Sequence, residues 1–489
     1  MKPRTGGRWP ARGRVGTADR AIMNRLAATD SVVLDKVLPL LSEAANHSVL
    51  WLGVAAGLSA TRSKWARRAA LRGLASVALA STATNVVGKK LTRRVRPSGE
   101  VPPARRVTGV RTTSFPSGHA ASAAAFATGV ALELPVLAAP AGALAAAVGA
   151  SRVVTGMHYP SDVLAGFATG TAAGLLTLRW WPRRPLEPAE AARPRREAPA
   201  APAGQGLVLV VNSDSGTASA ELAGQLRAEL PDARIVVAAE GSELPGLLTE
   251  AARTAKILGV AGGDGSVQLA AGLAVDRGLP LLVVPAGTFN HFAADLGVRS
   301  VTDAVTALRA GDAVLVDVAR AGQRSFVNTA STGIYVDLVR AREEYEQRLG
   351  KWPAVLVALA HVLRHSLPAD LVVNGHRRRV WLLFAGNCRY EPQGAAPSYR
   401  PDLSDSQLDI RMIDGSRPLA RVRLLAAVAL GTLGRCRVYR SWTASSLHVT
   451  TPDGTPVLLS VDGEAVQAEP SLMLRKRSER LLVYRPSEA

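Results

Sequence analysis

The 489-residue sequence predicts a multidomain fold, in which an all-α helical bundle in a membrane precedes a two-lobed domain with one α/β lobe and one mainly antiparallel β lobe. A chain of this length exceeds what one ordinary core supports. Charge also changes near residue 200: residues 1–200 hold 28 Lys and Arg against 10 Asp and Glu, and the remainder holds 31 against 29. Apolar runs fill the basic part, whereas strand-like and helix-like segments alternate in the neutral part, so the two parts are expected to fold differently.

Five apolar runs rich in Ala, Leu, Val and Gly predict the helices of the bundle, which we expect over residues 31–180. Each run is short, or interrupted by polar residues, compared with the roughly 20 residues of a membrane span, so a buried soluble bundle is the alternative. Low charge, small residues, and Trp180 and Trp181 at the end of the last run favour the membrane. Polar residues within 42–47 weaken the first run, and residues 1–30 are expected to be a basic, disordered N-terminus. The runs are Leu38–Ala60, Leu71–Gly88, Ala120–Leu134, Val136–Ala150 and Val163–Leu178.

A Pro/Ala/Arg segment over residues 181–205 predicts a linker, because its prolines oppose a helix and it offers little apolar surface to bury. From residue 206 to about 315, strands and helices alternate as in a parallel sheet with ligand loops at its carboxyl edge. Short strand-like runs joined through Asn374-Gly375 then predict a mainly antiparallel lobe over about 316–489. In the first lobe, strands are expected at Leu207–Val211, Arg234–Ala239, Ile257–Val260 and Leu281–Val284, and helices at Ala218–Leu230, Ser242–Thr254 and Ser266–Val275.

Three short segments of the bundle supply what phosphoryl transfer through a phosphohistidine requires. His158 is the candidate nucleophile, and Asp162, four residues later, is positioned to orient its imidazole and support the positive charge. His119 would protonate the leaving oxygen. A lone histidine at the end of an apolar helix usually has a structural role, so the prediction depends on the whole set. The groups expected to neutralise the phosphate oxygens are Lys89, Arg96, Ser117, Gly118 and Arg152.

These segments resemble the type 2 phosphatidic acid phosphatase family, because they match its three-part signature KxxxxxxRP, PSGH and SRxxxxxHxxxD without a substitution. The resemblance covers about residues 30–180. It implies a helical bundle, catalysis without a metal or other cofactor, and lipid phosphates or pyrophosphates as substrates. The family usually has six membrane helices and this sequence shows five, which leaves the topology open. Alternating spans would bring all three segments to one side of the membrane.

Three glycine-rich loops follow predicted strands of the α/β lobe, at residues 211–216, 262–266 and 285–290. Glycines at this edge let backbone amides approach phosphates, and the N-terminus of the following helix adds its dipole. An aspartate in such a loop repels phosphate unless a cation mediates, so Asp264 indicates Mg²⁺ or another contact to a nucleotide.

The loops in this order, with Asp462-Gly463-Glu464 near the C-terminus, resemble the catalytic domain of the diacylglycerol kinase family, within the superfamily that also holds sphingosine and NAD kinases. The resemblance spans about residues 206–485 and implies ATP and Mg²⁺. It makes Glu464 the general base for a lipid hydroxyl. It also assigns Asp405 and Asp409 to a structural Mg²⁺ site, although Ser406 replaces the usual glycine there. The nucleotide-binding residues that it implies are Asn212, Gly216, Gly262, Gly263, Asp264, Gly265, Ser266, Thr288 and Asn290.

Together the two resemblances predict a bifunctional, multi-pass enzyme of the cell membrane, a lipid phosphatase and a diacylglycerol kinase-like lipid kinase. ATP places the kinase domain in the cytoplasm, and Arg179, Arg183 and Arg184 after the last run agree with the positive-inside rule, so the phosphatase site is expected outside. With five spans, however, the basic N-terminus would also lie outside, against that rule. The alternatives are a kinase acceptor such as a sphingoid base, a polyprenol or NAD, or a second domain that only binds a lipid or a nucleotide to regulate the phosphatase.

The expected partners are lipid substrates, the membrane and ATP. Nucleic acid is not expected, because the basic residues flank apolar runs and do not alternate with aromatic residues. An oligomer is compatible with the sequence. Cys388 and Cys436 are the two cysteines, which is too few for a disulfide framework or a cysteine metal site.

Overall fold

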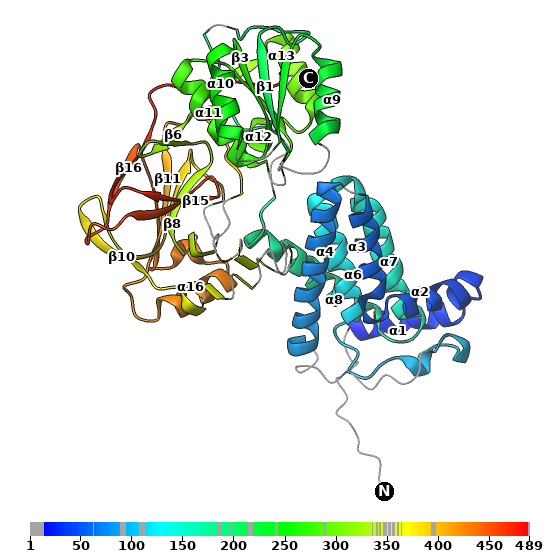
Figure 1. Cartoon of the computed structure of the whole chain (residues 1–489). Helices are drawn as coiled ribbons and strands as arrows, with labels where there is room; N and C mark the ends of the chain where they lie inside the picture. The colour runs from blue at the N-terminus through cyan, green and yellow to red at the C-terminus, as the bar shows by residue number, and fades with distance from the viewer. Residues whose placement is uncertain are drawn as a thin grey trace. The chain divides into compact units, whose positions relative to one another are not determined.

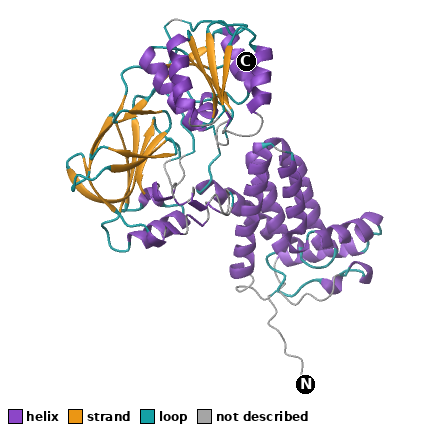
Figure 2. Ribbon diagram, in the orientation of Figure 1, coloured by secondary structure: helices purple, strands orange, loops and turns teal. Residues whose placement is uncertain are grey.

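The computed structural model describes residues 14–487 except 62, 89–93, 107–112, 184–186, 196, 214–218, 240–242, 288–289, 335, 339–340, 342–343, 346–349, 351–353, 355–356, 359–360, 363 and 393–397. The chain divides into two compact units, Met1–Arg183 and Arg184–Ala489. Helices form the first unit, and the second combines helices with strands (Figure 1). The predicted fold class, a helical bundle followed by an α/β lobe and an antiparallel β lobe, is confirmed (Figure 2).

Helix α6 (Gly118–Glu133) lies at the centre of the helical unit, and most of its residues are buried. Helices α4 (Lys64–Thr82), α7 (Ala138–Val154) and α8 (Pro160–Leu176) pack against it. Small residues allow close contacts: a Cβ on Gly166 of α8 would lie 2.5 Å from the Ser117 carbonyl oxygen, and one on Gly129 of α6 would lie 2.8 Å from Gly73 Cα. Such packing suits helices that gain little from burying apolar side chains against each other.

The first apolar run forms two helices, not one. Helix α2 (Leu38–Ala44) ends in a 3-10 turn, Asn46–Ser48, before α3 (Val49–Ala60) begins, and Ser48 has a left-handed φ of 63°. The second run begins earlier than expected as α4 and continues in a π-helical turn, Ala83–Gly88. Two helical stretches among the described residues, Pro135–Val154 and Pro160–Arg179, have the length and apolar composition of a membrane span, and α3 is shorter.

The N-terminal region differs from the disordered segment expected over residues 1–30. Residues 14–27 form helix α1 (Arg14–Ala27), and residues 1–13 lie outside the described part of the chain. Met23 of α1 is fully buried beside Val101 and Val163, and Asp19 is 3% exposed. The basic composition of this segment gave no indication of the buried positions of Met23 and Asp19, which fix α1 to the bundle.

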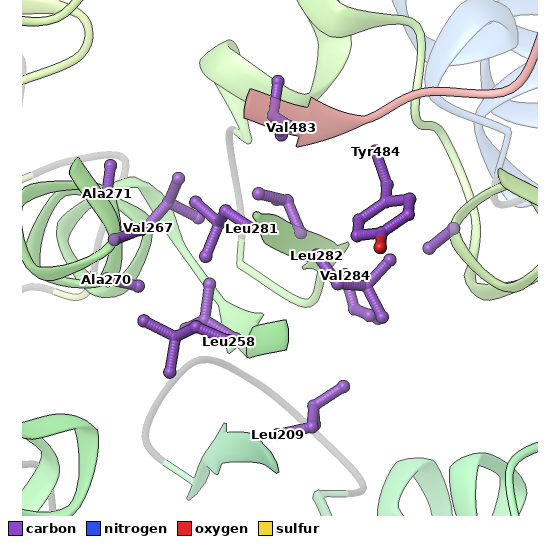
Figure 3. Close-up of a cluster of buried hydrophobic side chains, with 14 of the residues drawn as sticks. Leu209, Leu258, Val267, Ala270, Ala271, Leu281, Leu282, Val284, Val483 and Tyr484 are labelled. Carbon is purple, nitrogen blue, oxygen red and sulfur yellow. The ribbon is translucent and has the colours of Figure 1, made fainter. Parts of the chain in front are cut away.

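The α/β lobe contains a six-stranded sheet in the order β2-β1-β3-β4-β17-β5. The first four strands are parallel, as predicted, and the C-terminal β17 returns from the second lobe to lie between β4 and β5. Val483 and Tyr484 of β17 belong to the same buried cluster as Leu258, Leu281 and Val267 (Figure 3). The bounds are β1 (Leu207–Asn212), β2 (Arg234–Ala238), β3 (Ile257–Gly262), β4 (Leu281–Pro285), β5 (Ala313–Val316), β17 (Leu481–Tyr484), α9 (Ser219–Glu229), α10 (Leu244–Thr254), α11 (Asp264–Arg277), α12 (His291–Leu296) and α13 (Val301–Ala310).

The second lobe is an eleven-stranded antiparallel sheet. The predicted hairpin through Asn374 and Gly375 is confirmed: β9 and β10 pair in register from Val373 and His376, and both turn residues have positive φ. The bounds are β6 (Ala319–Ala321), β7 (Arg324–Phe326), β8 (Thr329–Gly333), β9 (Ala369–Val373), β10 (His376–Asn387), β11 (Leu408–Asp414), α16 (Ala420–Ala429), β12 (Tyr439–Ala444), β13 (Ser446–Thr450), β14 (Val457–Val461), β15 (Glu464–Ala468) and β16 (Ser471–Lys476).

Part of the predicted linker packs on the α/β lobe. Ala198 and Ala201 are buried, and the Pro199 carbonyl accepts a hydrogen bond of 2.7 Å from the Tyr484 hydroxyl. The Ala189 amide donates to the Asp295 carbonyl at 2.8 Å. Alanine and proline therefore bury enough surface to fix this segment without forming a helix.

Candidate active sites

His158 lies in the turn between α7 and α8 and is 2% exposed. Its Nδ1 is 2.5 Å from the Ser114 carbonyl oxygen and 3.8 Å from Asp162 Oδ2. Because both neighbours are acceptors, the ring proton belongs on Nδ1, and Nε2 keeps its lone pair. Nε2 accepts a hydrogen bond of 3.2 Å from Arg96 Nη1, so a positive charge stands beside the candidate nucleophilic atom.

The protonation of His158 follows from this setting. Burial lowers the pKa of His158 below its usual value, and the Arg96 charge acts in the same direction, while Asp162 and the Ser114 carbonyl oppose the shift. A lowered pKa keeps the imidazole neutral near pH 7, which is the state that a nucleophile requires.

Asp162 is fully buried and holds the start of α8 in place. Its Oδ2 accepts the Tyr159 amide at 2.9 Å, and its Oδ1 accepts Arg94 Nη1 at 2.6 Å. Arg94 also pairs with Asp19 of α1 at 2.7 Å. Sequence reasoning missed Arg94, which is one arginine among several there, and Asp19, which lies in the segment expected to be disordered.

Asn46 joins two of the predicted residues. Its Oδ1 lies 3.1 Å from Arg152 Nη2 and 3.1 Å from His119 Nε2. Arg152 also donates to the Ser42 carbonyl at 2.5 Å. The polar interruption of the first apolar run, which counted against a membrane span, is therefore the signal that marks this part of the site.

Arg152 is a buried, charged side chain whose hydrogen-bond partners are neutral. It is 1% exposed, and its recorded hydrogen bonds go to a carbonyl and an amide oxygen. Its Nε is buried without a hydrogen-bond partner among the described residues. A buried donor of this kind costs free energy unless a ligand satisfies it, and an anion such as phosphate would supply both charge and acceptors.

The PSGH segment forms the N-terminus of α6. The Ser117 hydroxyl accepts from the Ala120 amide at 3.4 Å as the helix cap, and the Ser117 amide donates to the Asp162 carbonyl at 3.0 Å. Gly118 begins the helix. The structure thus brings together the predicted phosphatase residues except Lys89, which lies outside the described residues.

In the second unit, the glycine-rich loops that the structure describes lie against one another. A Cβ on Gly287 would lie 3.1 Å from the Gly263 nitrogen and 2.9 Å from Asn290 Oδ1, so the loops can meet this closely only with a glycine at position 287. Asn290, with a left-handed φ of 51°, accepts from the Gly287 amide at 2.9 Å. Asn212 Nδ2 donates to Ser266 Oγ at 2.9 Å and joins the first loop to the second. Two predicted residues of these loops, Gly216 and Thr288, lie outside the described residues.

Asp264 is the first residue of α11, directly after Gly262 and Gly263. Its carboxylate accepts the His291 amide at 3.1 Å, the Phe292 amide at 3.2 Å and Asn328 Nδ2 at 3.1 Å. These bonds use three of the roughly four lone-pair positions of a carboxylate. Asp264 therefore fixes the start of α12 and joins the two lobes, and one position on Oδ2 remains for a ligand.

Glu464 is an exposed residue at the start of β15, in the second lobe. A Cβ on Gly265 would lie 2.6 Å from Glu464 Oε1, so the carboxylate lies over the backbone of the second glycine-rich loop. The preceding Asp462, at φ 47°, accepts the amides of Val327, Asn328 and Thr329 at 2.9, 2.9 and 2.6 Å. Burial raises the pKa of Asp462 to about 7 while these amides oppose the shift. The Asp462-Gly463 turn thereby fixes the direction in which Glu464 projects.

The residues assigned to a structural Mg²⁺ do not fit one. Asp409 Oδ2 accepts the Tyr390 amide at 3.0 Å and pairs with Arg411 at 2.7 Å. Both Asp405 oxygens accept backbone amides, from Arg389 and Gln407, at 2.8 Å each. Ser406 has a left-handed φ of 59°, which accounts for the glycine usual at this position.

A different group of possible metal ligands lies nearby, formed by Asp317, Cys388 and Asp405, whose ligand atoms lie within 4.8 Å of one another. Lys476 Nζ, however, is 3.0 Å from Asp317 Oδ2 and 3.1 Å from Cys388 Sγ. Burial raises the pKa of Cys388 to about 12, so the sulfur is a thiol, a poor ligand for Mg²⁺. A lysine ammonium supplies the positive charge at this position.

Comparison with known proteins divides the chain in the same way. The family model described as the PAP2 superfamily matches residues 69–186, and the diacylglycerol kinase catalytic domain matches residues 206–321. A decaprenylphosphoryl-5-phosphoribose phosphatase of Mycobacterium tuberculosis is 36% identical over 168 residues, which are 32% of this chain and 90% of that protein.

Two further similarities are more limited. A lipid A 1-phosphatase of Rhizobium johnstonii is 47% identical over 64 residues, so this chain spans only 26% of that relative's length and the match covers 13% of this chain. A solved structure of a putative diacylglycerol kinase from Bacillus anthracis is 20% identical, with a TM-score of 0.44, and the match covers 57% of this chain and 97% of that one.

Proposed function

Because the chain belongs to the PAP2 superfamily and also carries a diacylglycerol kinase catalytic domain, we propose that it is a bifunctional membrane enzyme. One site removes phosphate from a lipid phosphate through a phosphohistidine, without a metal. The other transfers phosphate from ATP to a lipid alcohol such as diacylglycerol.

In the phosphatase reaction, His158 Nε2 attacks phosphorus, and the bond from phosphorus to the lipid oxygen breaks as His119 donates a proton to that oxygen. Water then attacks the phosphohistidine, His119 takes a proton from the water, and inorganic phosphate leaves. Arg96 and Arg152 hold the phosphate oxygens. The observation that carries this proposal is the buried Arg152 guanidinium, with an unsatisfied Nε, in the same site as a histidine whose Nε2 keeps its lone pair.

In the kinase reaction, Glu464 removes the proton of the lipid hydroxyl, and the oxygen attacks the γ-phosphorus of ATP as ADP leaves. The contact between Glu464 and Gly265 supports this role, because it brings a carboxylate to the loop expected to hold the phosphates. Mg²⁺ would arrive as the complex with ATP.

The bundle supports opposite sides of the membrane for the two sites. Ser117 and Gly118 stand at one end of α6 and Glu133 at the other, about 24 Å away for 16 residues at 1.5 Å each. The chain leaves the helical unit at the Glu133 end: Arg68 pairs with Glu133 at 2.5 Å and donates to the Pro182 carbonyl at 2.7 Å. With residues 206–489 in the cytoplasm, the His158 site would face outward. A lipid phosphorylated inside would then escape immediate dephosphorylation.

The name of the mycobacterial relative indicates a class of substrate for the phosphatase site, which is a phosphate carried on a polyprenyl lipid. A lipid of this kind presents its phosphate at the membrane surface, where the His158 site would lie.

Matched His158→Ala and Asp264→Ala variants test the proposal. His158→Ala should lower phosphate release from a lipid phosphate by at least about 10³-fold, because it removes the nucleophile, and should leave the incorporation of labelled phosphate from ATP into lipid intact. Asp264→Ala should lower the incorporation of phosphate from ATP into lipid and leave phosphate release from a lipid phosphate intact. Loss of both activities in either variant would exclude two independent sites, and absence of ATP turnover in the parent chain would exclude the kinase.

A further inference from the structure

Helix α16, between β11 and β12, has an apolar face on each side. Ala420 and Leu424 of its inner face pack with Trp381, Ile413 and Val438. The outer face is also apolar, although a surface helix normally turns polar residues outward. Its exposed side chains are Val422 at 60% and Leu425 at 51%, with Leu419 at 71% and Leu430 at 64% near the helix ends.

The segment that carries this face is basic, although the Asp414 carboxylate lies near Arg417 and Arg440. Residues 416–440 contain six arginines and no aspartate or glutamate, whereas residues 201–489 as a whole are nearly neutral. Arg423, Arg435 and Arg437 are exposed. An exposed aliphatic centre with a basic surround is the pattern of a helix that lies in the interface of an anionic lipid layer.

Arg421 fixes helix α16 to the rest of the second lobe. Arg421 Nη1 donates to the Arg364 carbonyl at 2.9 Å, Nη2 donates to the Ser366 carbonyl, and the guanidinium lies 5.2 Å from the centre of the Trp381 ring. Leu367, the residue after Ser366, is 79% exposed. Figure 1 shows α16 at the end of the second lobe that is remote from β1 and α9.

We propose that α16 docks the kinase unit onto an anionic phospholipid surface, with Val422 and Leu425 among the acyl chains and Arg423, Arg435 and Arg437 among the headgroups. This inference rests on the proposed kinase function, because a lipid acceptor has to be reached in the bilayer. A nucleic acid would satisfy the arginines but would leave the aliphatic side chains in water. A second copy of this chain would meet the same positive charge.

The docking itself can be measured without any activity. A Leu425→Cys substitution in the full chain, with Cys436→Ser to remove the half-buried native thiol, carries an environment-sensitive dye after reconstitution into nanodiscs. Nitroxides on the lipid acyl chains should quench this dye in phosphatidylglycerol discs, and much less in phosphatidylcholine discs. The same dye on Ala220→Cys, an exposed residue of α9, is the control and should stay unquenched.

Substitutions on the face connect docking with turnover. In Arg423→Gln with Arg437→Gln, the KM for lipid, as a mole fraction in the disc, should rise about 25-fold, since each arginine near the surface contributes about fivefold. The KM should also rise in Val422→Asp with Leu425→Asp, which places two carboxylates against the anionic surface. The kcat for a short-chain, water-soluble acceptor should not change. Met473→Asp, at an apolar position on β16 that is 43% exposed, is the control and should behave like the parent chain.

The outcomes separate the two proposals. An unquenched dye at position 425 in every disc would overturn the docking, even if the chain phosphorylates lipid. Quenching that disappears in the Val422→Asp, Arg423→Gln and Arg437→Gln background would support docking. If the same chain phosphorylated no acceptor, the proposed kinase function would be wrong while the docking surface remained supported.

Discussion

The contact between the glycine-rich loops leads to a direct prediction: Gly287→Ala should disable the kinase and spare the phosphatase. A Cβ on Gly287 would lie 2.9 Å from Asn290 Oδ1 and 3.1 Å from the Gly263 nitrogen. The Gly263 Cα would be nearer still than these two atoms, and ordinary contacts with a Cβ start near 3.4 Å, so the loops would have to separate by more than about 0.5 Å. A displacement of about 1 Å costs roughly 100-fold in rate, so we expect the kinase kcat/KM to fall by about 10- to 100-fold.

Two activities measured on one preparation make this a controlled experiment. Transfer of labelled phosphate from ATP to lipid reports the kinase, and phosphate release from a lipid phosphate reports the phosphatase, which should match the parent chain. Gly246→Ala is the control for the chemical change, because a Cβ at that position of α10 would meet nothing within 4 Å. If Gly287→Ala kept the kinase kcat/KM within about twofold of the parent value, which is about 0.4 kcal/mol, the loop contact would not belong to the active site.

Three further predictions concern charge. Lys476→Met should lower the free energy of unfolding by about 3 kcal/mol, because it leaves Asp317 buried and with less positive charge beside it. Neither Mg²⁺ nor EDTA should shift the melting temperature of the parent chain. The acid limb of the phosphatase kcat/KM profile should lie below pH 6.5, because the lowered pKa of His158 keeps its imidazole neutral as the pH falls. Asp162→Asn should move that limb to still lower pH, because Asp162 raises the pKa of His158. Glu133→Gln should destabilise the bundle by about 3 kcal/mol in thermal unfolding, because the fully buried Arg72, 2.5 Å from Glu133, would lose its counter-charge.

The sequence predicted the parts of the fold that depend on local periodicity. The strands from β1 to β4 and the hairpin of β9 and β10 follow from apolar runs and an Asn-Gly turn, which are properties of a few neighbouring residues. The return of β17 to the first sheet was missed, since Leu481–Tyr484 pairs with strands at least 165 residues earlier in the chain. Nothing within a four-residue segment specifies which sheet it joins.

In the candidate sites, too, the sequence predicted what depends on local motifs and missed contacts between distant segments. Motif spacing predicted His158, Asp162 and Glu464, because the proposed chemistry restricts the residue types at these positions. It did not identify Asn46 or Asp19, which come from other helices and act only through the side chains that they hold. The metal assignment to Asp405 and Asp409 carried over a family pattern without the residues around it. Lys476 is 67 residues after Asp409, and its position beside Asp317 is visible only in three dimensions.

The two sites share a way of using carboxylates. Asp162, Asp264 and Asp462 stand inside the motifs that indicate catalysis, yet they also accept one, two and three backbone amides, respectively. Asp162 binds the turn that carries His158, and Asp264 binds the start of α12 beside Gly287. Asp462 binds the connection between β7 and β8, and this contact fixes the turn that projects Glu464. A carboxylate that accepts several amides orders a loop more firmly than a neutral side chain does, because charge-assisted hydrogen bonds are roughly twice as strong as neutral ones. In this chain the three motif aspartates therefore order the backbone, and in the proposed mechanisms the nucleophile is His158 and the general base is Glu464.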